Sequence, residues 1–446
     1  MPEPRPAAPS TSTWTLTRAS RLALAIYAGV TVAMLVTAGA ARLSTHTPYD
    51  HFALLAEAWL HGRLDLGGPP PAYAHHNDFA ELGGKTFVSF PPFPALLIAP
   101  LVALCGSAER TPDALFFGLF TGVGPAFLFL ALERLREARR VATSERENVG
   151  LALLFAFGTV YWFSAVQGTV WFAAHVVGVA LACVYAWAAI DARRPVVAGV
   201  ALALGFATRT PLGFAFPLFA FEALRVSDVD LGCLPDRGDR RRGGDLRRAA
   251  RLFAVFAAPG FVVTALLLWH NAARFGDPFE FGHKLLAVAW RARMQRWGLF
   301  SFHYLGRNLA VALAGMPYFG GGAPLQINGH GLALWITSPF YAWAIWPRRT
   351  GALFWALALT AAAVALPSLL YQNSGWLQFG YRFSNDYAPF LVLLVAVGRR
   401  RLGDAFWALG AVAVAVNLFG AVTFGREGYE RYYFVDPTQK VLVQPD

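Results

Sequence analysis

Charged residues in general, and lysine in particular, are scarce in this chain. Of its 446 residues 15% are charged, against about 25% in a soluble globular domain. Lysine occurs only at positions 85, 284 and 440, so the formal net charge of +11 comes from arginine. With 56% hydrophobic residues and a mean hydropathy of +0.44, the composition excludes an ordinary soluble domain.

Several motifs are also missing. Cys105, Cys183 and Cys233 form no CxxC pair, so neither a disulfide framework nor a metal knuckle is indicated. The sequence has no Walker motif, no GxGxxG and no HExxH. These are the usual signatures of ATP hydrolysis, nicotinamide chemistry and zinc proteolysis, so the sequence does not indicate these activities. The arginines lie in short clusters between apolar runs, so nucleic-acid binding is not indicated either.

Long apolar runs dominate what is present, and about 18 apolar residues suffice to cross a bilayer core. The run 22–41 follows Arg18 and Arg21; it is too long for a signal-peptide core, which predicts an uncleaved first helix with a cytoplasmic N-terminus. The sequence therefore predicts an all-α polytopic membrane protein with about eleven transmembrane helices. The other expected crossings are 112–133, 148–166, 171–190, 195–209, 211–225, 251–271, 331–346, 350–371, 386–398 and 404–424.

The arginine clusters orient these crossings because basic loops stay in the cytoplasm. The clusters are Arg134 to Arg140, Arg193 and Arg194, Arg237 to Arg251, Arg348 and Arg349, and Arg399 to Arg401. They alternate consistently only if the proline-punctuated stretch 91–107 is re-entrant or interfacial; the alternative, a twelfth crossing, places basic loops outside. The expected parts are a cytoplasmic tail 1–21, a transmembrane domain 22–424 with outer stretches 43–111 and 272–330, and an outer tail 425–446.

The first outer stretch begins with THTPYDHFALLAEAWLHGRLDL. Its apolar residues recur at helical spacing, which predicts an interfacial amphipathic helix over 49–61. Asp50 then falls at the helix start, and Glu57 lies two turns further on the polar side. An aspartate there is often only a helix cap, but its position where the first crossing reaches the outer surface also suits a catalytic role.

A hairpin is expected next, with strands at Phe79–Leu82 and Thr86–Phe90 around a GG turn. His75, His76, Asp78 and Lys85 in this region could bind a metal or a phosphate. The paired histidines lack the spacing of a specific metal motif, so a solvated loop is the simpler interpretation for them. Lys85 stands out because lysine is so rare here.

The segments YDHFALLAEAWLHGRLDL and GGKTFVSFPPFPALLIAPLVAL, in this order after the first helix, resemble polytopic membrane glycosyltransferases of the GT-C fold. The nearest resemblance is to bacterial relatives of the protein O-mannosyltransferase and lipid A aminoarabinose transferase families. The resemblance implies that Asp50 is the catalytic acidic residue of the first outer loop. It also implies that Lys85, with Pro91 and Pro92, corresponds to the lysine-proline element near the donor phosphate.

The segment AVQGTVWFAAHVVGV resembles the second outer loop of these families, where a second acidic residue is frequent. His175 stands there instead, with Gln167 and Trp171 beside it. This departure puts a two-carboxylate metal site in doubt. His175 therefore remains a candidate for orienting the acceptor or for binding a metal.

Arg382 and Asp386 lie four residues apart just before an expected helix, a spacing that permits an ion pair on one helical face. The alternatives are a salt bridge that closes the helix end and a site in which Arg382 holds a phosphate. Tyr381 and its neighbours Gln378 and Trp376 supply polar groups and a flat ring of the kind that recognises sugars. The basic stretch from Arg274 to Arg296 suits either a lipid phosphate or interfacial anchoring.

These features favour a glycosyltransferase that uses a polyprenyl-phosphate sugar at the outer face of the cytoplasmic (inner) membrane. Asp50 is expected to act as general base, and Arg382 and Lys85 to stabilise the leaving phosphate; Glu57 is a reserve carboxylate. The expected partners are the lipid-linked donor, membrane lipids and a glycan, lipid or protein acceptor, with a divalent metal left open. A transporter or lipid flippase is the competing function, and a non-catalytic scaffold comes third.

Overall fold

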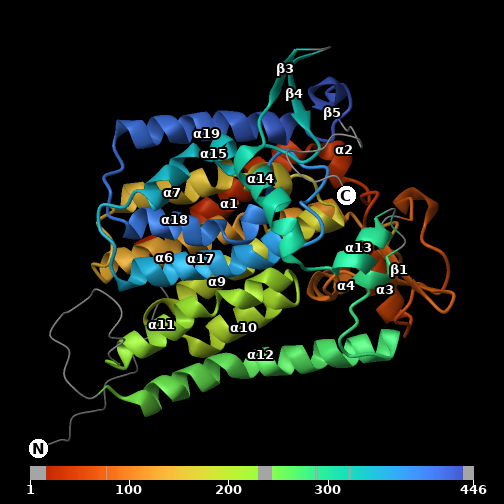
Figure 1. Cartoon of the computed structure of the whole chain (residues 1–446), viewed down its shortest axis with the longest axis horizontal. Helices are drawn as coiled ribbons and strands as arrows, with labels where there is room; N and C mark the ends of the chain where they lie inside the picture. The colour runs from red at the N-terminus through yellow and green to blue at the C-terminus, as the bar shows by residue number, and fades with distance from the viewer. Residues whose placement is uncertain are drawn as a thin grey trace, which may run out of the picture.

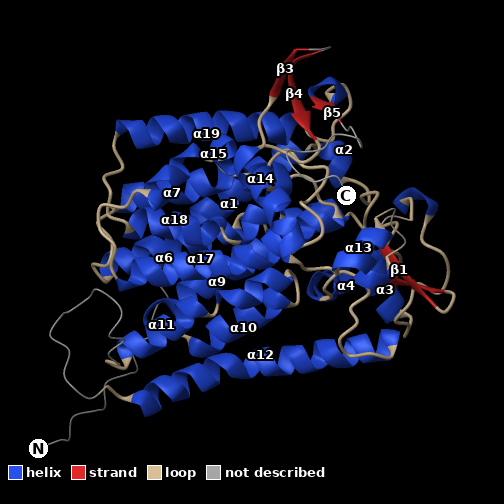
Figure 2. Ribbon diagram, viewed as in Figure 1, coloured by secondary structure: helices blue, strands red, loops and turns tan. Residues whose placement is uncertain are grey.

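The computed structural model describes residues 17–434 apart from 77, 230–243, 287, 289 and 321–322. The N-terminal 16 residues, most of the expected cytoplasmic loop with Cys233, and the end of the outer tail with Lys440 lie outside the described residues. The described chain is mostly helical, with two small sheets at one end of the molecule (Figure 2).

Six helical spans are long and apolar enough to cross a membrane, and they run along the long axis of the molecule (Figure 1). They are α1 (Arg18–Ala38), α5 with α6 (Asp113–Gly118 and Val123–Glu137), α9 (Val170–Ala189) with the short η2 (Ile190–Ala192), α12 (Leu246–Phe275), α17 (Ala352–Leu370) and α19 (Asp404–Thr423). Each coincides with a crossing expected from the sequence.

The other expected crossings are helical but short or interrupted. Gly158, Pro217 and Pro339 lie at or beside the interruptions, where glycine and proline interrupt a helix most easily. The expectation of eleven crossings therefore stays a prediction. These segments are α7 (Glu145–Phe157) with α8 (Tyr161–Ala165), α10 (Pro195–Phe206), η3 (Thr210–Ala215) with α11 (Pro217–Val226), α15 (Leu334–Thr337) with η6 (Pro339–Tyr341) and α16 (Ala342–Ile345), and η7 (Arg382–Asp386) with α18 (Ala388–Val397).

The first outer stretch folds against one end of the bundle. It contains α2 (Ala40–Leu43), α3 (His51–Leu60), η1 (Ala72–Ala74) and α4 (Phe93–Cys105). Helix α4 has 13 residues, a length of about 20 Å, so it is too short to cross a hydrocarbon core of about 30 Å. It packs against α3, and the re-entrant or interfacial placement of 91–107 stays a prediction.

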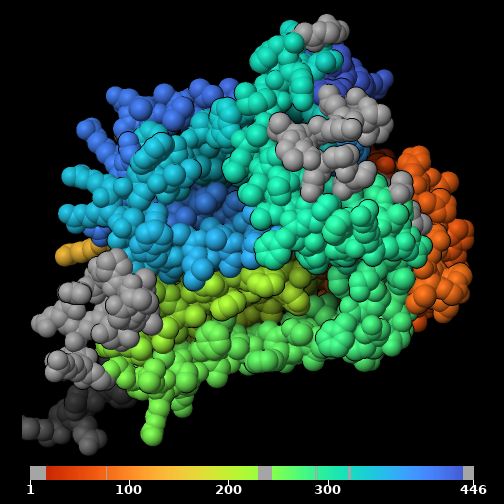
Figure 3. Space-filling model, in the orientation of Figure 1, coloured from red at the N-terminus to blue at the C-terminus, as the bar shows by residue number. Residues whose placement is uncertain are grey.

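The predicted hairpin is present as β1 (Phe79–Leu82) and β2 (Lys85–Val88), paired antiparallel. Gly83 and Gly84 both have positive φ, the conformation that a two-residue type I′ turn requires. The second outer stretch lies beside this hairpin and covers that end of the visible face (Figure 3). Its elements are η4 (His283–Leu285), α13 (Arg291–Trp297), η5 (Phe302–Tyr304), α14 (Leu305–Ala314), and β3 (Tyr318–Gly320) with β4 (Ala323–Asn328), which pair with β5 (Tyr433–Phe434) after η8 (Glu430–Tyr432).

The arginine clusters meet at the opposite end of the bundle. The guanidinium of Arg399 donates hydrogen bonds to the carbonyls of Arg139 and Arg140, and the amides of Arg348 and Arg349 donate to the carbonyl of Gly398. Loops that are far apart in the sequence are thus in direct contact, as expected if all of them lie on one side of a membrane.

A buried carboxylate joins the helices at this arginine end. The Glu222 side chain is 0% exposed. Its carboxylate oxygens lie 2.6 Å from Nη2 of Arg140 and 2.9 Å from Nη2 of Arg225. Asp191, in the turn after α9, also pairs with Arg140 and Arg225. Because an ionised carboxylate is costly to bury without a partner, Glu222 holds α11 in a fixed position against α6 and α9.

We predict that Glu222→Gln destabilises the folded protein by about 3 to 5 kcal/mol because it leaves two arginines without their buried partner. The matched control is Glu145→Gln, which removes the carboxylate from the exposed pair with Arg18 and is expected to cost at most about 1 kcal/mol. Thermal unfolding in detergent compares the two variants. Equal losses of stability would show that burial of Glu222 contributes nothing.

Candidate functional site

Asp50 directly precedes α3, as predicted, and is 1% exposed. Its carboxylate makes no capping hydrogen bond to the α3 backbone. Oδ2 accepts a hydrogen bond from the Tyr73 hydroxyl at 3.1 Å, and Oδ1 is buried without a partner. A cap would direct its oxygens at the helix amides, so the capping interpretation does not explain this buried carboxylate.

Burial and the nearby charge of Asp113 raise the pKa of Asp50 to about 8. The two carboxylates differ in their environments. Asp113 accepts hydrogen bonds from the amide and hydroxyl of Thr47 and from the amide of Ala114, so its oxygens are occupied in holding the chain after α2 against α5. Asp50 is the member of the pair with a free oxygen, and a carboxyl group with this pKa can exchange protons near neutral pH.

An aromatic wall connects Asp50 to α9. The His51 ring stacks on Phe79 of β1 with centroids 4.3 Å apart, and the Tyr49 ring lies 4.7 Å from Trp171. The carbonyl of Tyr49 also accepts a hydrogen bond from the amide of Val170 at 2.9 Å. The first and second outer loops, predicted from separate segments, thus form one surface.

Beyond this wall, Asp386 forms a buried ion pair with Arg209. Nε and Nη2 of Arg209 contact Oδ1 and Oδ2 of Asp386 at 3.0 and 2.6 Å, and Nδ1 of His175 lies 3.3 Å from Oδ1. Asp386 is 1% exposed, and these cationic partners offset the cost of burying its charge. His175, which was expected to orient an acceptor or bind a metal, contacts the ion pair between Asp386 and Arg209.

Of the two alternatives for Arg382 and Asp386, the ion pair between them does not form in the described structure, because Asp386 pairs with Arg209. Residues 382–386 form a 3-10 helix, whose turn contains three residues, so positions four apart do not share a face. The Arg382 guanidinium instead donates through Nη1 to the carbonyls of Trp376 and Leu377 at 3.1 and 3.3 Å. It lies over the rings of Phe172 and Phe383.

Arg382 is nevertheless a buried cation. It is 7% exposed, its Nε is buried without a partner, and no described carboxylate forms an ion pair with it. A guanidinium stays protonated at neutral pH, so Arg382 carries a positive charge. An anion placed beside it would gain a strong, charge-assisted interaction.

Asp78, which the sequence named only among residues that could bind a metal or a phosphate, contacts α9. Its Oδ2 accepts a hydrogen bond from Nε1 of Trp171 at 2.8 Å. Burial raises its pKa, while Trp171 and the charge of Arg382 oppose this increase. The sequence carried one weak signal, an acidic residue beside a hairpin in a chain with few charges, but nothing indicated its contact with α9.

The remaining candidates lie apart from this cluster or have structural partners. Lys85 is at the hairpin tip, where its side chain is 64% exposed and pairs with Asp65 at 3.3 Å. Glu57 accepts a hydrogen bond from the amide of Ala108, and Gln167 donates one to the carbonyl of Phe163. Tyr381 is fully buried, and its hydroxyl has no partner.

The described residues do not fit a metal centre. Nowhere among them do three or more His, Cys, Asp or Glu side chains group so that they could hold a metal ion. His175 contacts one carboxylate, and Asp50 and Asp78 stand on different parts of the aromatic wall.

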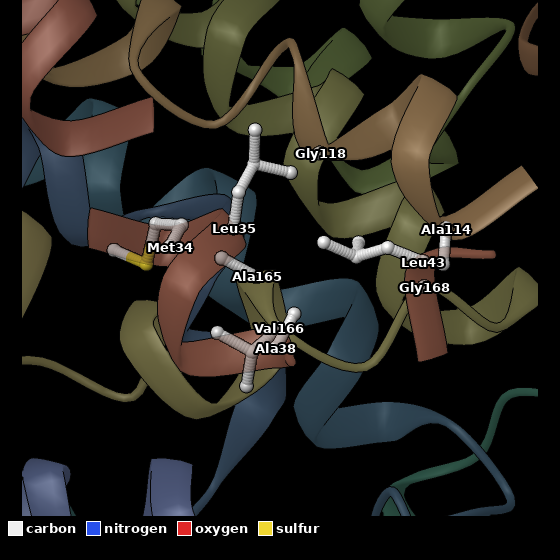
Figure 4. A pocket seen from close by; sticks show the side chains of 9 residues that line it. All are labelled: Met34, Leu35, Ala38, Leu43, Ala114, Gly118, Ala165, Val166 and Gly168. Atoms are coloured by element: carbon white, nitrogen blue, oxygen red, sulfur yellow. The ribbon is translucent and has the colours of Figure 1, made fainter. Parts of the chain in front are cut away.

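An apolar pocket lies between α1, α5 and the loop that leads to α9 (Figure 4). None of the predicted site residues lines it. Its lining residues are Met34, Leu35, Ala38, Leu43, Ala114, Gly118, Ala165, Val166 and Gly168. A pocket without polar side chains does not recognise a sugar or a phosphate, so the polar cluster is the candidate site.

No family model and no curated protein matches the chain. Its fold matches the apo oligosaccharyltransferase of Archaeoglobus fulgidus with a TM-score of 0.50 at 12% identity, over 92% of this chain and 57% of that one. It also matches apo ArnT of Cupriavidus metallidurans with a TM-score of 0.52 at 14% identity, over 90% of this chain and 63% of that one. ArnT has also been solved bound to undecaprenyl phosphate.

The chain therefore has the fold of the GT-C glycosyltransferases, as the sequence resemblance implied. It spans less than two thirds of the length of either protein. At these identities the likeness shows the fold alone.

Proposed function

We propose that this protein is a glycosyltransferase that moves a sugar from a polyprenyl-phosphate donor to an acceptor hydroxyl at the outer face of the inner membrane. The observation that carries the proposal is the buried carboxylate of Asp50, which caps no helix and keeps one oxygen unpartnered. Two further observations support it: the GT-C fold, and a buried, charged Arg382 on the same aromatic surface.

The proposed reaction is a single displacement with inversion. The acceptor hydroxyl attacks the anomeric carbon of the sugar, the bond from that carbon to the phosphate oxygen breaks, and the acceptor proton passes to Asp50. The polyprenyl phosphate leaves with the electron pair, and a guanidinium stabilises its developing charge. Because the donor travels in the bilayer, the enzyme needs no nucleotide-binding motif.

Arg382 is assigned to the leaving phosphate because its Nη2 makes no hydrogen bond with any described residue. Lys85 is the second predicted phosphate contact. It stands roughly 14 Å along the hairpin from Asp78, by the rise of about 3.4 Å per residue, so it attracts an approaching anionic headgroup rather than sharing the phosphate of Arg382. The exposed ion pair between Lys85 and Asp65 contributes about 1 kcal/mol or less, so an anionic headgroup can replace Asp65 readily.

The arginine clusters, which meet at the end opposite Asp50, support the proposed orientation. Positive loops stay in the cytoplasm, which favours an N-terminus inside and a site outside. A transporter is the alternative function. Purified protein in nanodiscs, given a polyprenyl-phosphate sugar labelled in the sugar, distinguishes the two: release of polyprenyl phosphate supports transfer, whereas movement of an intact donor in proteoliposomes supports transport.

Asp50→Asn is expected to abolish sugar transfer, since the amide cannot take the acceptor proton, while the variant remains folded. The assay is label transfer to endogenous acceptor in membranes, with thermal unfolding as the folding measurement. The matched control is Glu57→Gln, whose carboxylate contacts only the Ala108 amide among the described residues. Transfer by Asp50→Asn at the rate of this control would refute Asp50 as the base.

Activity should also depend on pH in a defined direction. The raised pKa of about 8 means that Asp50 is protonated below this pH, and a protonated carboxyl cannot act as a base. We expect kcat/KM to rise about tenfold per pH unit toward pH 8 and then to level off. A flat profile between pH 6 and 9 would contradict the assignment.

Arg382→Ala is expected to raise the KM for the lipid donor by about 10- to 100-fold, the range that corresponds to losing hydrogen bonds from a charged group, with a smaller change in thermal stability. Arg349→Ala, on an exposed side chain at the opposite end, is the control and should leave KM unchanged. A variant that loses stability but binds donor normally would make Arg382 a structural residue.

A further inference from the structure

Asp78 is held in place from several sides. It lies between Tyr73, which donates to Asp50, and β1, and its backbone is left-handed with φ 61°. Nε1 of Trp171 fixes Oδ2 at 2.8 Å, and the hydroxyl of Ser89 donates to the Asp78 carbonyl at 3.4 Å. A conformation that non-glycine residues adopt rarely thus aims this carboxylate at α9.

One oxygen of Asp78 is still available. Oδ1 accepts no hydrogen bond from the described residues, and it is not among their enclosed, unpartnered polar atoms. The residue as a whole is half-buried. A carboxylate with one oxygen fixed and one oxygen open can accept a hydrogen bond from a ligand without having to be reoriented.

Arg382 also lies beside α9, and it too has an atom that is available to a ligand. Its Nη2 has no partner among the described residues, and its charge is close enough to affect Asp78, yet no ion pair joins them there. The ring of Phe172 packs on the Arg382 guanidinium, and Trp171, the next residue in the chain, binds Asp78. Two consecutive residues in the first turn of α9 thus contact Asp78 and Arg382, which places a carboxylate and a cation beside the same turn of that helix.

We propose that Asp78 determines sugar specificity by accepting a hydrogen bond from a hydroxyl of the donor sugar while Arg382 holds the phosphate on that sugar. The proposal rests on the function proposed above. It assigns Asp78 and Arg382 to the two parts of a sugar phosphate, whose hydroxyls donate hydrogen bonds and whose phosphate is an anion. The preferred sugar then carries a free hydroxyl near its anomeric carbon and no carboxylate, because Asp78 repels a uronic acid.

The experiment uses full-length protein in nanodiscs and a panel of short-chain polyprenyl-phosphate monosaccharides: a neutral hexose, its monodeoxy analogues and the matching uronic acid. For the preferred hexose, Asp78→Asn should raise KM about 10- to 100-fold, the cost of losing a hydrogen bond to a charged group. With the wild type, one deoxy analogue should show a KM that is raised by the same factor. With Asp78→Asn, removing that hydroxyl should raise the KM little further. In Asp78→Asn, the KM for the uronic acid should fall relative to the KM for the hexose.

The matched control is Glu81→Gln on the same hairpin, which removes an exposed carboxylate and should leave every KM unchanged. Trp171→Phe keeps the ring but removes the N–H that fixes Asp78, so it should weaken the discrimination among the sugars and provides a second variant if Asp78→Asn fails to fold. Wild-type protein without transfer activity refutes the proposed function. Active wild type with an unchanged sugar preference in Asp78→Asn and in Trp171→Phe refutes the role of Asp78 alone.

Discussion

The buried ion pair between Arg209 and Asp386 organises the site described here. It joins the turn between α10 and η3 to the start of α18, and His175 brings α9 to the same carboxylate. A carboxylate that is 1% exposed is costly to keep ionised without such a partner. With Asp386 committed to Arg209, the guanidinium of Arg382 on the same 3-10 turn has no carboxylate partner among the described residues, and this is what makes it available to an anion.

The two ends of the bundle use charge in different ways. At the arginine end, Glu222 and Asp191 neutralise Arg140 and Arg225, Arg136 pairs with Glu133, and Arg399 and Arg400 donate to backbone carbonyls. These are closed networks that fix helix ends. At the opposite end Asp50, Asp78 and Arg382 each keep an atom without a protein partner. Unsatisfied polar groups cost stability, so their concentration at one end supports the placement of the chemistry there.

Features encoded by local sequence were predictable. Helical periodicity located α3 and placed Asp50 at its start, the GG pair located the hairpin, and the arginine clusters predicted which loops would meet. Contacts between distant segments were not predictable. Arg209 lies 177 residues before Asp386, and Trp171 lies 93 residues after Asp78; no periodicity connects such positions. The error at Arg382 and Asp386 came from assuming an α-helical turn where the chain forms a tighter 3-10 turn, a difference that spacing alone does not reveal.

The central claim is that one lipid-linked sugar occupies the surface between Asp50 and Arg382. Photo-crosslinking of full-length protein in nanodiscs, with a polyprenyl-phosphate sugar that carries a diazirine on the sugar, tests it most directly when the modified peptides are mapped by mass spectrometry. The account predicts labelling within 47–52, 73–79, 171–175 and 376–386, and competition by unlabelled polyprenyl phosphate. Labelling confined to the arginine end, within 134–140 and 222–226, would contradict it.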